Sequence, residues 1–222
     1  MLGDSWSADL WHEPYRYPGY NPEHCLRRQI ECESGEFVIN FSRAAAGHVS
    51  QLEKIKTQIH PDTSARVLMA ATDWYRDFIK NTLKFTGTYN QDLLRAHAYL
   101  KEILHSLETT HPNLKWYHWG GQNCVWYRSI LPQSHSVLYD NYAHEQYATL
   151  KTETGLTTWW DSLDRFFNSH IPNTDKKQRK QLTKETVNCM KYRAVNTILF
   201  PDGGHLDWRL YKPLVTRFLE TE

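Results

Sequence analysis

The sequence predicts a predominantly α-helical protein: an irregular multi-helix bundle with an extended N-terminal arm and room for one short β-hairpin. Three observations lead to this fold class. Apolar residues recur every three or four positions over most of the chain. Prolines separate one helical stretch from the next. The first 22 residues combine many aromatic rings with three prolines, which suits neither a helix nor a central strand.

The expected helices follow from this apolar spacing. One stretch runs from residue 36 to residue 59 and stops at His60-Pro61. The clearest amphipathic pattern covers residues 67–83, and the next begins at an Asn90 cap and reaches Leu107. Further helical stretches are expected at 22–33, 136–152, 156–167, 176–195 and 206–218.

After His111-Pro112, apolar residues no longer recur every three or four positions. Residues 114–119 and 124–127 are rich in aromatic side chains and flank the dipeptide Gly120-Gly121. Two such runs across a glycine turn are typical of a β-hairpin, so a hairpin is expected over residues 114–127.

The chain is expected to consist of an aromatic arm, residues 1–22, and a single helical domain, residues 23–222. An arm that is apolar and extended must lay its rings on a surface, either of its own domain or of a neighbouring subunit. The rings that would make this interface are Trp6, Trp11, Tyr15, Tyr17 and Tyr20.

Charge and composition limit the function classes. The chain has 26 basic and 25 acidic residues, a net charge of +1, so no global field favours nucleic acid or an anionic membrane. No apolar run reaches the roughly 18 residues of a membrane span, and the start lacks the pattern of a signal peptide. We therefore expect a soluble, intracellular protein. Its 9 Trp, 13 Tyr and 8 Phe fit an aromatic core or extensive contacts with copies of itself.

Four cysteines are candidates for cross-links. Cys25 and Cys32 stand seven residues apart on the expected helix 22–33, about 10 Å along its axis, which is too far for a bond between them. Each would need a remote partner in this chain or in another. Buried, reduced thiols are the alternative for a chain without a secretion signal. The remaining two cysteines are Cys124 and Cys189.

No metal or cofactor site is predicted. His144-Glu145 begins a zinc-protease pattern, but position 148 is Ala where that pattern needs a second His. Two short fragments offer only two potential ligands each, His60 with Asp62 and His205 with Asp207.

A nucleophile pattern is also present around the expected hairpin. Cys124 with His118 offers a nucleophile and a base, and the backbone of Gly120-Gly121 offers oxyanion donors. No residue in the sequence is placed to orient His118 as the base, so a cysteine hydrolase is not the leading hypothesis.

Size, aromatic arm, helical body and four cysteines together resemble the nudivirus occlusion-body proteins, the polyhedrins, and not the mostly β baculovirus polyhedrins. This resemblance implies a mainly α-helical subunit without a catalytic site. Its subunits would form a crystalline lattice around virions through exchanged segments and disulfides. Cys25, Cys32, Cys124 and Cys189 would be the cross-link candidates, and the arm would be the exchanged segment. Assembly would occur inside the infected host cell, in its nucleus, before release as occlusion bodies.

The balance of titratable groups is compatible with a lattice that dissolves in alkali. The subunit is almost neutral at pH 7, where repulsion between copies is least. Loss of the Lys charges and ionisation of all 13 Tyr above pH ~10 would bring the net charge to about −25.

The leading hypothesis is therefore a structural, non-enzymatic protein that assembles with itself into an occlusion body. The alternative is a small intracellular hydrolase or nuclease, assisted by a metal, with its site drawn from His118, His205 and Asp207. A third hypothesis is a nucleic-acid-associated protein that uses the basic run 176–184; a solvated helix face explains that run better in a nearly neutral chain.

Overall fold

The computed structural model describes residues 1–3, 25–43, 46–72, 76–79, 83–84, 86, 88–120, 125–140, 142, 145 and 208–222. Their centre is a parallel sheet of three strands, β1 (Ala65–Ala71), β2 (Leu114–Gly120) and β3 (Ser136–Tyr139), in that order. β1 and β2 pair along their full length from Ala65↔Leu114 to Ala71↔Gly120. β2 and β3 pair with a register shift between His118 and Trp119. All strands therefore end at the same edge, which we call the carboxyl edge.

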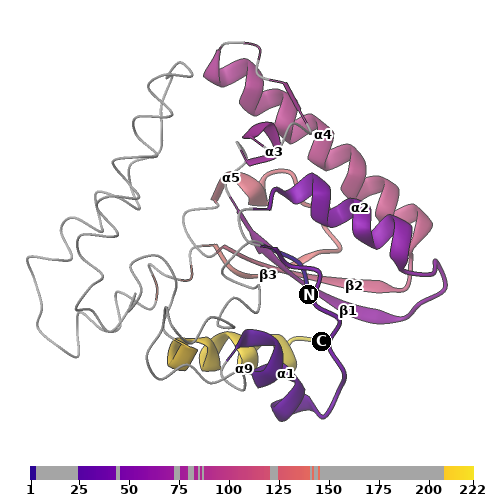
Figure 1. The fold of residues 1–222 in the computed structure, drawn as a ribbon, viewed down its shortest axis with the longest axis vertical. Coiled ribbons are helices and arrows are strands. Elements are labelled where there is room, and N and C mark those ends of the chain that lie inside the picture. Colours follow the sequence, from indigo (N-terminus) through magenta and orange to yellow (C-terminus); the bar gives the residue numbers. More distant parts are fainter. Residues whose placement is uncertain are drawn as a thin grey trace, which may run out of the picture.

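Helices cover both faces of this sheet (Figure 1). On one face lie α2 (His48–Gln58) and α4 (Tyr89–Thr110), with the short helices α3 (Arg76–Ile79) and α5 (Val125–Arg128) near the carboxyl edge. On the other face lie α1 (Leu26–Ser34) and α9 (Lys212–Glu220), preceded by the 3-10 helix η3 (Trp208–Tyr211). The described residues form a three-layer α/β/α arrangement.

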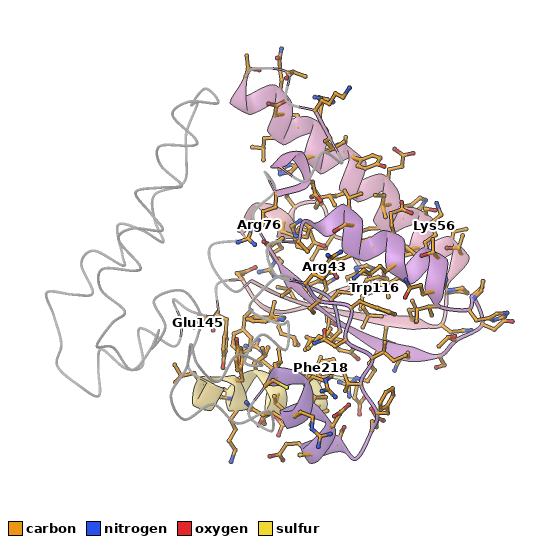
Figure 2. All side chains as sticks on the ribbon, viewed as in Figure 1. Arg43, Lys56, Arg76, Trp116, Glu145 and Phe218 are labelled. Carbon is orange, nitrogen blue, oxygen red and sulfur yellow. The ribbon has the colours of Figure 1, made fainter. Side chains whose placement is uncertain are left out.

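Each face of the sheet has its own apolar core. Val67, Met69 and Trp116 point toward α2 and α4, whereas Leu68 and Tyr117 point toward α1 and α9. Figure 2 shows the labelled Trp116 and Phe218 on opposite sides of the strands. Strands buried on both faces read as continuous apolar runs, and Ala65–Ala71 has this character, with five consecutive buried residues.

The first three residues add to the outer edge of β1. Leu2 N–H donates to Leu68 O at 2.9 Å, and Ala70 N–H donates to Leu2 O at 2.9 Å, which is the parallel pattern. On their other side, Phe41 N–H donates to Met1 O and Arg43 N–H to Gly3 O. Residues 39–43 and 1–3 thus continue the sheet beyond β1 in the same direction.

The predominantly α prediction is wrong. Half of the interpretable residues are helical, 18% lie in strands, and the parallel sheet makes the fold mixed α/β. The expected helix 67–83 contains β1 and then α3, and the expected helix 136–152 begins with β3. Residues 36–43 are extended, so only the second half of the expected helix 36–59 is helical.

The hairpin over 114–127 is also wrong, because its first half is the central parallel strand β2 and residues 125–128 are helical. The expected helices at 22–33, 90–107 and 206–218 correspond to α1, α4 and η3 with α9. No described helix has both the length and the apolar character that a bilayer crossing requires.

The predicted arm, 1–22, is described only at Met1–Gly3, which pair with β1 of the same chain. Trp6, Trp11, Tyr15, Tyr17 and Tyr20 lie outside the described residues, as do the expected helices 156–167 and 176–195. The exchange of this arm between subunits therefore stays a prediction.

Candidate active site at the carboxyl edge of the sheet

A small cavity lies at the carboxyl edge. Its volume is about 10 Å³, close to the space that one water molecule needs. The ends of all three strands and helix α5 contribute to its lining, which includes Ala71, His118, Gly120, Tyr127, Tyr139 and Asp140. Open parallel sheets bind their ligands outside the carboxyl ends of the strands, so this edge is where a site is expected in such a fold.

The strand of Met1–Gly3 ends at the same edge. Because Leu2 pairs in parallel with Met69, the chain leaves this strand beside the end of β1. Gly3 has φ 150°, a conformation that side-chain-bearing residues rarely adopt. Gly3 directly precedes Asp4 and Ser5 in the sequence.

The start of η3 and α9 is anchored at this edge as well. Tyr142, which follows β3, donates its phenol hydrogen to Leu210 O and accepts from Leu214 N–H at 3.3 Å. The Tyr211 ring stands edge-on to Trp119 at the end of β2, with ring centroids 6.2 Å apart. The other end of α9 lies at the amino ends of the strands, where Arg66 donates to Phe218 O.

These contacts fix the direction in which the chain arrives. α9 runs antiparallel to the strands, so the residues that precede Trp208 enter η3 from the carboxyl edge. The sequence immediately before Trp208 is Asp202-Gly-Gly-His205-Leu-Asp207.

A first buried polar pair ties α2 and α3 to the end of β1. His48 Nε2 accepts a hydrogen bond from Thr72 N–H at 3.0 Å, so its proton is on Nδ1, which faces Asp77 Oδ2 at 3.6 Å. Asp77 Oδ1 in turn accepts from Val49 N–H at 2.9 Å and caps the first turn of α2. Both side chains are almost fully buried, so the pair is a structural link.

A second buried pair lies beneath the small cavity. His118 Nε2 and His135 Nδ1 are 2.9 Å apart and share one hydrogen. His135 Nε2 lies 3.7 Å from Glu108 Oε1. Desolvation by burial is the main cause that lowers the pKa of His118 well below its usual range, and His135 adds to it. Burial likewise lowers the pKa of His135 to about 4, although Glu108 opposes the shift. Both rings are therefore neutral at pH 7.

The described residues do not hold a metal centre: they contain no group of three or more His, Cys, Asp or Glu that could coordinate an ion. His60 and Asp62, one of the two-ligand fragments, face each other at 3.6 Å with their side chains 75% and 89% exposed. Such an exposed pair offers no further ligand and no enclosed site.

Of the predicted cross-link residues, the structure describes two. Cys25 is buried at the N-cap of α1, and Cys32 is a free, exposed thiol on the same helix. Cys124 and Cys189 lie outside the described residues.

The residues of the metal-assisted hydrolase alternative are also only partly described by the structure. His118 is buried beneath the small cavity, whereas His205 and Asp207 lie outside the described residues, just before η3. The basic run 176–184 also lies outside them.

Sequence reasoning missed the partners of these histidines, Asp77 and His135, and the significance of Gly3-Asp4-Ser5. The two buried partners come from separate elements and leave no local pattern. The signal at the start was a glycine, an acid and a serine directly after two apolar residues, but a strand of three residues is too short to show a period.

Comparisons of the chain with models of protein families, with curated proteins and with solved structures found no match. The functional conclusion therefore depends on the topology and chemistry of this edge alone.

Proposed function

We propose that this protein is a hydrolase that uses Ser5 to attack the carbonyl carbon of an ester at the carboxyl edge of the sheet. The observation that supports this proposal is that three chain segments reach the carboxyl edge of the sheet, where the ends of β1, β2 and β3 line a small cavity. One segment leaves the sheet at Gly3, one leaves it at Gly120, and one enters η3 at Trp208.

The lengths of these segments keep their polar residues near the edge. Consecutive Cα atoms are 3.8 Å apart, so Ser5 lies within about 8 Å of Gly3 whatever path the chain takes. By the same limit, Asn123 is within about 11 Å of Gly120, and His205 is within about 11 Å of Trp208. A serine, an amide and a histidine therefore stand within two or three residues, along the sequence, of described positions at this edge.

These residue types suit acyl transfer. The Ser5 hydroxyl would attack the ester carbonyl while His205 takes its proton, and His205 would then return that proton to the departing alkoxide. Water, deprotonated by the same histidine, would release the acid from the acyl-serine and regenerate Ser5. Asp202, three residues before His205, would orient the imidazole. The Asn123 amide and backbone N–H groups at Gly3 and Gly120 would stabilise the oxyanion.

The histidines within the described residues do not fill the role of the base. His48 is engaged by Thr72 N–H and faces Asp77 in the interior. His118 shares a hydrogen with His135, is 1% exposed, and has a pKa lowered well below its usual range. The interpretation of Cys124 with His118 as a nucleophile and its base therefore loses its base. The same burial disfavours His118 as a metal ligand in the metal-assisted alternative.

The occlusion-body hypothesis stays a prediction. The mainly α subunit that the resemblance implies is replaced by a mixed α/β fold, and Cys25 is too deeply buried for a bond to another chain. Cys32 is exposed and accessible to such a bond. Diffracting particles that dissolve only above pH ~10, and more easily with a reductant, would restore that hypothesis.

Ester hydrolysis by matched variants tests the proposal. Ser5→Ala and His205→Ala should each lower the rate with p-nitrophenyl acetate by about a thousandfold or more, the size expected for loss of a nucleophile or its base. Ser7→Ala, two residues from Ser5, and Asp207→Asn, two residues from His205, serve as controls and should retain activity. A chelator should have no effect. Equal rates for Ser5→Ala and Ser7→Ala would overturn the proposal, and a rate that disappears with Cys124→Ala would transfer it to the cysteine.

A further inference from the structure

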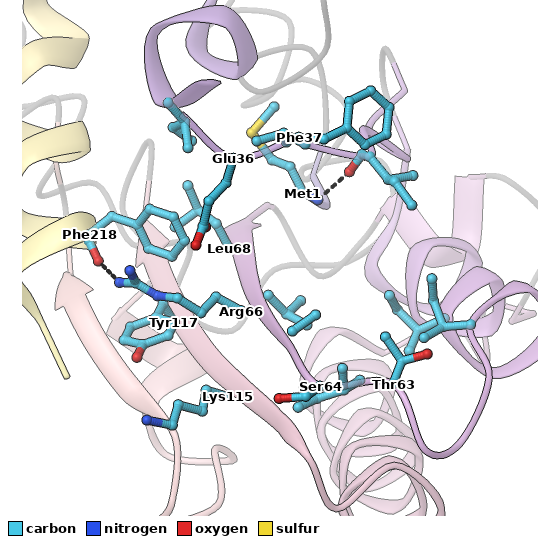
Figure 3. A pocket seen from close by; sticks show the side chains of 18 of the residues that line it. Met1, Glu36, Phe37, Thr63, Ser64, Arg66, Leu68, Lys115, Tyr117 and Phe218 are labelled. Carbon is cyan, nitrogen blue, oxygen red and sulfur yellow. Dashed lines mark hydrogen bonds between the residues drawn. The ribbon is translucent and has the colours of Figure 1, made fainter. Parts of the chain in front are cut away.

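Two cavities of different character lie at opposite ends of the parallel sheet. The larger, about 730 Å³, is at the amino end of β1 and has a mostly apolar lining (Figure 3). Arg66 in its wall donates to Phe218 O and packs against the Tyr117 ring. The smaller, about 10 Å³, is the cavity at the carboxyl edge. Of the two, the smaller has the size of one water molecule, and the polar groups that line it decide what it holds.

Small residues end two of the strands at this small cavity. β1 finishes at Ala71 and β2 at Gly120, and both residues line the cavity. From these two strand ends, therefore, no side chain larger than a methyl group enters the space. His118 lines the cavity from β2, and Asp140 lines it from the position directly after β3. A water molecule in such a space needs two to four polar partners.

The first polar partner is His118, whose two ring nitrogens have different surroundings. Nε2 lies 2.9 Å from His135 Nδ1. Nδ1 is buried and has no hydrogen-bond partner within the described residues. The His118 residue is 1% exposed, so bulk solvent does not reach this nitrogen. Because an unsatisfied buried nitrogen is unfavourable, Nδ1 requires a partner from the cavity that the residue lines.

The His118 hydrogen is on Nε2, which makes Nδ1 an acceptor. His135 Nε2 faces Glu108 Oε1 at 3.7 Å, and a carboxylate favours a hydrogen on the ring nitrogen that faces it. His135 Nδ1 is then without a hydrogen and accepts from His118 Nε2. Ser134 Oγ also donates to Glu108 Oε1 and helps to hold that carboxylate in place. Because burial keeps the pKa of His118 well below its usual range, the ring is neutral at pH 7 and Nδ1 carries a lone pair.

The second polar partner is Asp140. Its Oδ2 accepts a hydrogen bond from Arg128 Nη1 at 2.8 Å, which orients the carboxylate. Its Oδ1 is buried and has no hydrogen-bond partner within the described residues. A carboxylate oxygen can only accept. Two acceptors that each need a donor, His118 Nδ1 and Asp140 Oδ1, therefore belong to residues that line the same small cavity.

Water is the molecule whose hydrogens match these two acceptors. It has two donor hydrogens and the volume of the cavity. A hydroxyl group has one hydrogen and would leave one acceptor unsatisfied. A metal ion such as Zn²⁺ takes three or four protein ligands, and the described lining of the cavity offers one imidazole and one carboxylate.

We propose that the small cavity binds one water molecule that donates to His118 Nδ1 and Asp140 Oδ1, and that this water hydrolyses the acyl-serine. The second part rests on the proposed function. With both hydrogens held, the water oxygen keeps a lone pair for attack on the acyl carbon. The bond from oxygen to that carbon forms, and the bond from the carbon to Ser5 Oγ breaks. One hydrogen passes through His205 to Ser5 Oγ, while the other stays directed at His118, which positions the water and does not take its proton.

A crystal structure of the protein at high resolution tests the water site without reference to activity. We expect an ordered water oxygen within about 3.2 Å of both His118 Nδ1 and Asp140 Oδ1. The nitrogen-15 NMR shifts of His118 at pH 7 should show a hydrogen on Nε2 and none on Nδ1. An empty cavity, or a hydrogen on Nδ1, would overturn the proposal.

Two substitutions of His118 separate the roles of its nitrogens. Gln reaches as far as Nε2 and keeps a donor to His135, but it leaves no acceptor at the position of Nδ1. Asn places its amide at the distance of Nδ1 and keeps an acceptor for the water. After treatment with p-nitrophenyl acetate, His118→Gln should lose the acetyl group from Ser5 about tenfold more slowly, the effect of one hydrogen bond of about 1.4 kcal/mol. His118→Asn should stay close to the parent protein, and so should the control His105→Gln, at a histidine that is 82% exposed.

Asp140→Asn provides a second variant. Arg128 should hold the amide oxygen and turn the amide nitrogen toward the cavity, so this change should slow the same step. Labelling of Ser5 by a fluorophosphonate consumes no water and should proceed at the parent rate in Asp140→Asn and His118→Gln. If Ser5 of the parent protein is not labelled, the proposed function is overturned, and the role of this water with it. If Ser5 is labelled and His118→Gln loses its acetyl group at the parent rate, the role of the water alone is overturned.

Discussion

The carboxylate of Asp77 occupies the space that a side chain on Gly47 would need. A Cβ atom at Gly47 would lie 2.1 Å from Asp77 Oδ1 and 2.9 Å from Asp77 N. The same Oδ1 caps α2 through Val49 N–H. A residue without a side chain at position 47 therefore allows α3 to approach the start of α2 and to close the buried link from Asp77 through His48 to β1.

Gly47→Ala should destabilise the protein by about 1–3 kcal/mol, the usual size of an overpacking change in a tight core. Urea denaturation measures this. In an Asp77→Ala background the same substitution should cost less, since two of the three closest atoms belong to the removed carboxylate. Additive effects in this double-mutant cycle would contradict the contact.

Stability should fall as the pH decreases through the range between the unfolded and folded pKa values of the histidine pair. His135 titrates near 6.5 when unfolded and about 4 when folded, and burial also lowers the pKa of His118 well below its usual range. The unfolded chain therefore binds more protons between these values, and each histidine contributes a loss of up to about 1.4 kcal/mol per pH unit.

The pH dependence of urea denaturation in a His118→Gln and His135→Gln double variant checks that assignment. Its slope between pH 6 and pH 4.5 should be shallower than that of the parent protein, whatever its absolute stability. His105→Gln removes a histidine that is 82% exposed and should leave the slope unchanged. An unchanged slope in the double variant would assign the acid sensitivity to other groups.

Tyr142→Phe should weaken the anchoring of η3 and α9. The substitution leaves Leu210 O without its phenol donor and Leu214 N–H without its acceptor, which should cost about 1–3 kcal/mol. It should also lower ester hydrolysis, because the segment that carries His205 enters η3 at this point. Tyr139→Phe is the matched control: its hydroxyl reaches Pro213 O at 3.5 Å in an exposed position and should matter little. Equal losses of stability and of ester hydrolysis in both variants would contradict the role of Tyr142 as the anchor of η3 and α9.

The two described cysteines should differ in reactivity. Cys32 is exposed and should react with iodoacetamide in the native protein, whereas Cys25 is 2% exposed and should react only when the protein unfolds. Peptide mass spectrometry after a short treatment separates the two. Rapid modification of Cys25 in the native state would contradict its place in the core.

The sequence predicted α4 well because a helix of 22 residues with one buried and one exposed face shows its period over several turns. It failed at β1. The strand is buried on both faces, so it shows an unbroken apolar run instead of alternation, and the apolar residues of the next segment prolonged that run into an apparent helix. The same ambiguity misassigned β3, which has only four residues.

Residues 36–43 show a different source of error. Phe37 and Phe41 are four residues apart, which fits one face of a helix and also fits one side of an extended strand. In the structure Phe37 is exposed, and Phe41 N–H donates to Met1 O. The spacing of apolar residues within 36–43 cannot reveal this backbone pairing, because its partner is 40 positions away in the sequence. For the same reason the carboxyl edge, which unites residues 3, 120 and 208, was not predictable before the strands were known to be parallel.

The central claim is that Ser5 is a nucleophile. A fluorophosphonate reacts covalently with an activated serine and scarcely with an ordinary one, and mass spectrometry locates the adduct. The account predicts one adduct per chain on Ser5, lost in Ser5→Ala, strongly slowed in His205→Ala and retained in Ser7→Ala. An unlabelled native chain, or an adduct spread over several serines and unaffected by His205→Ala, would contradict it.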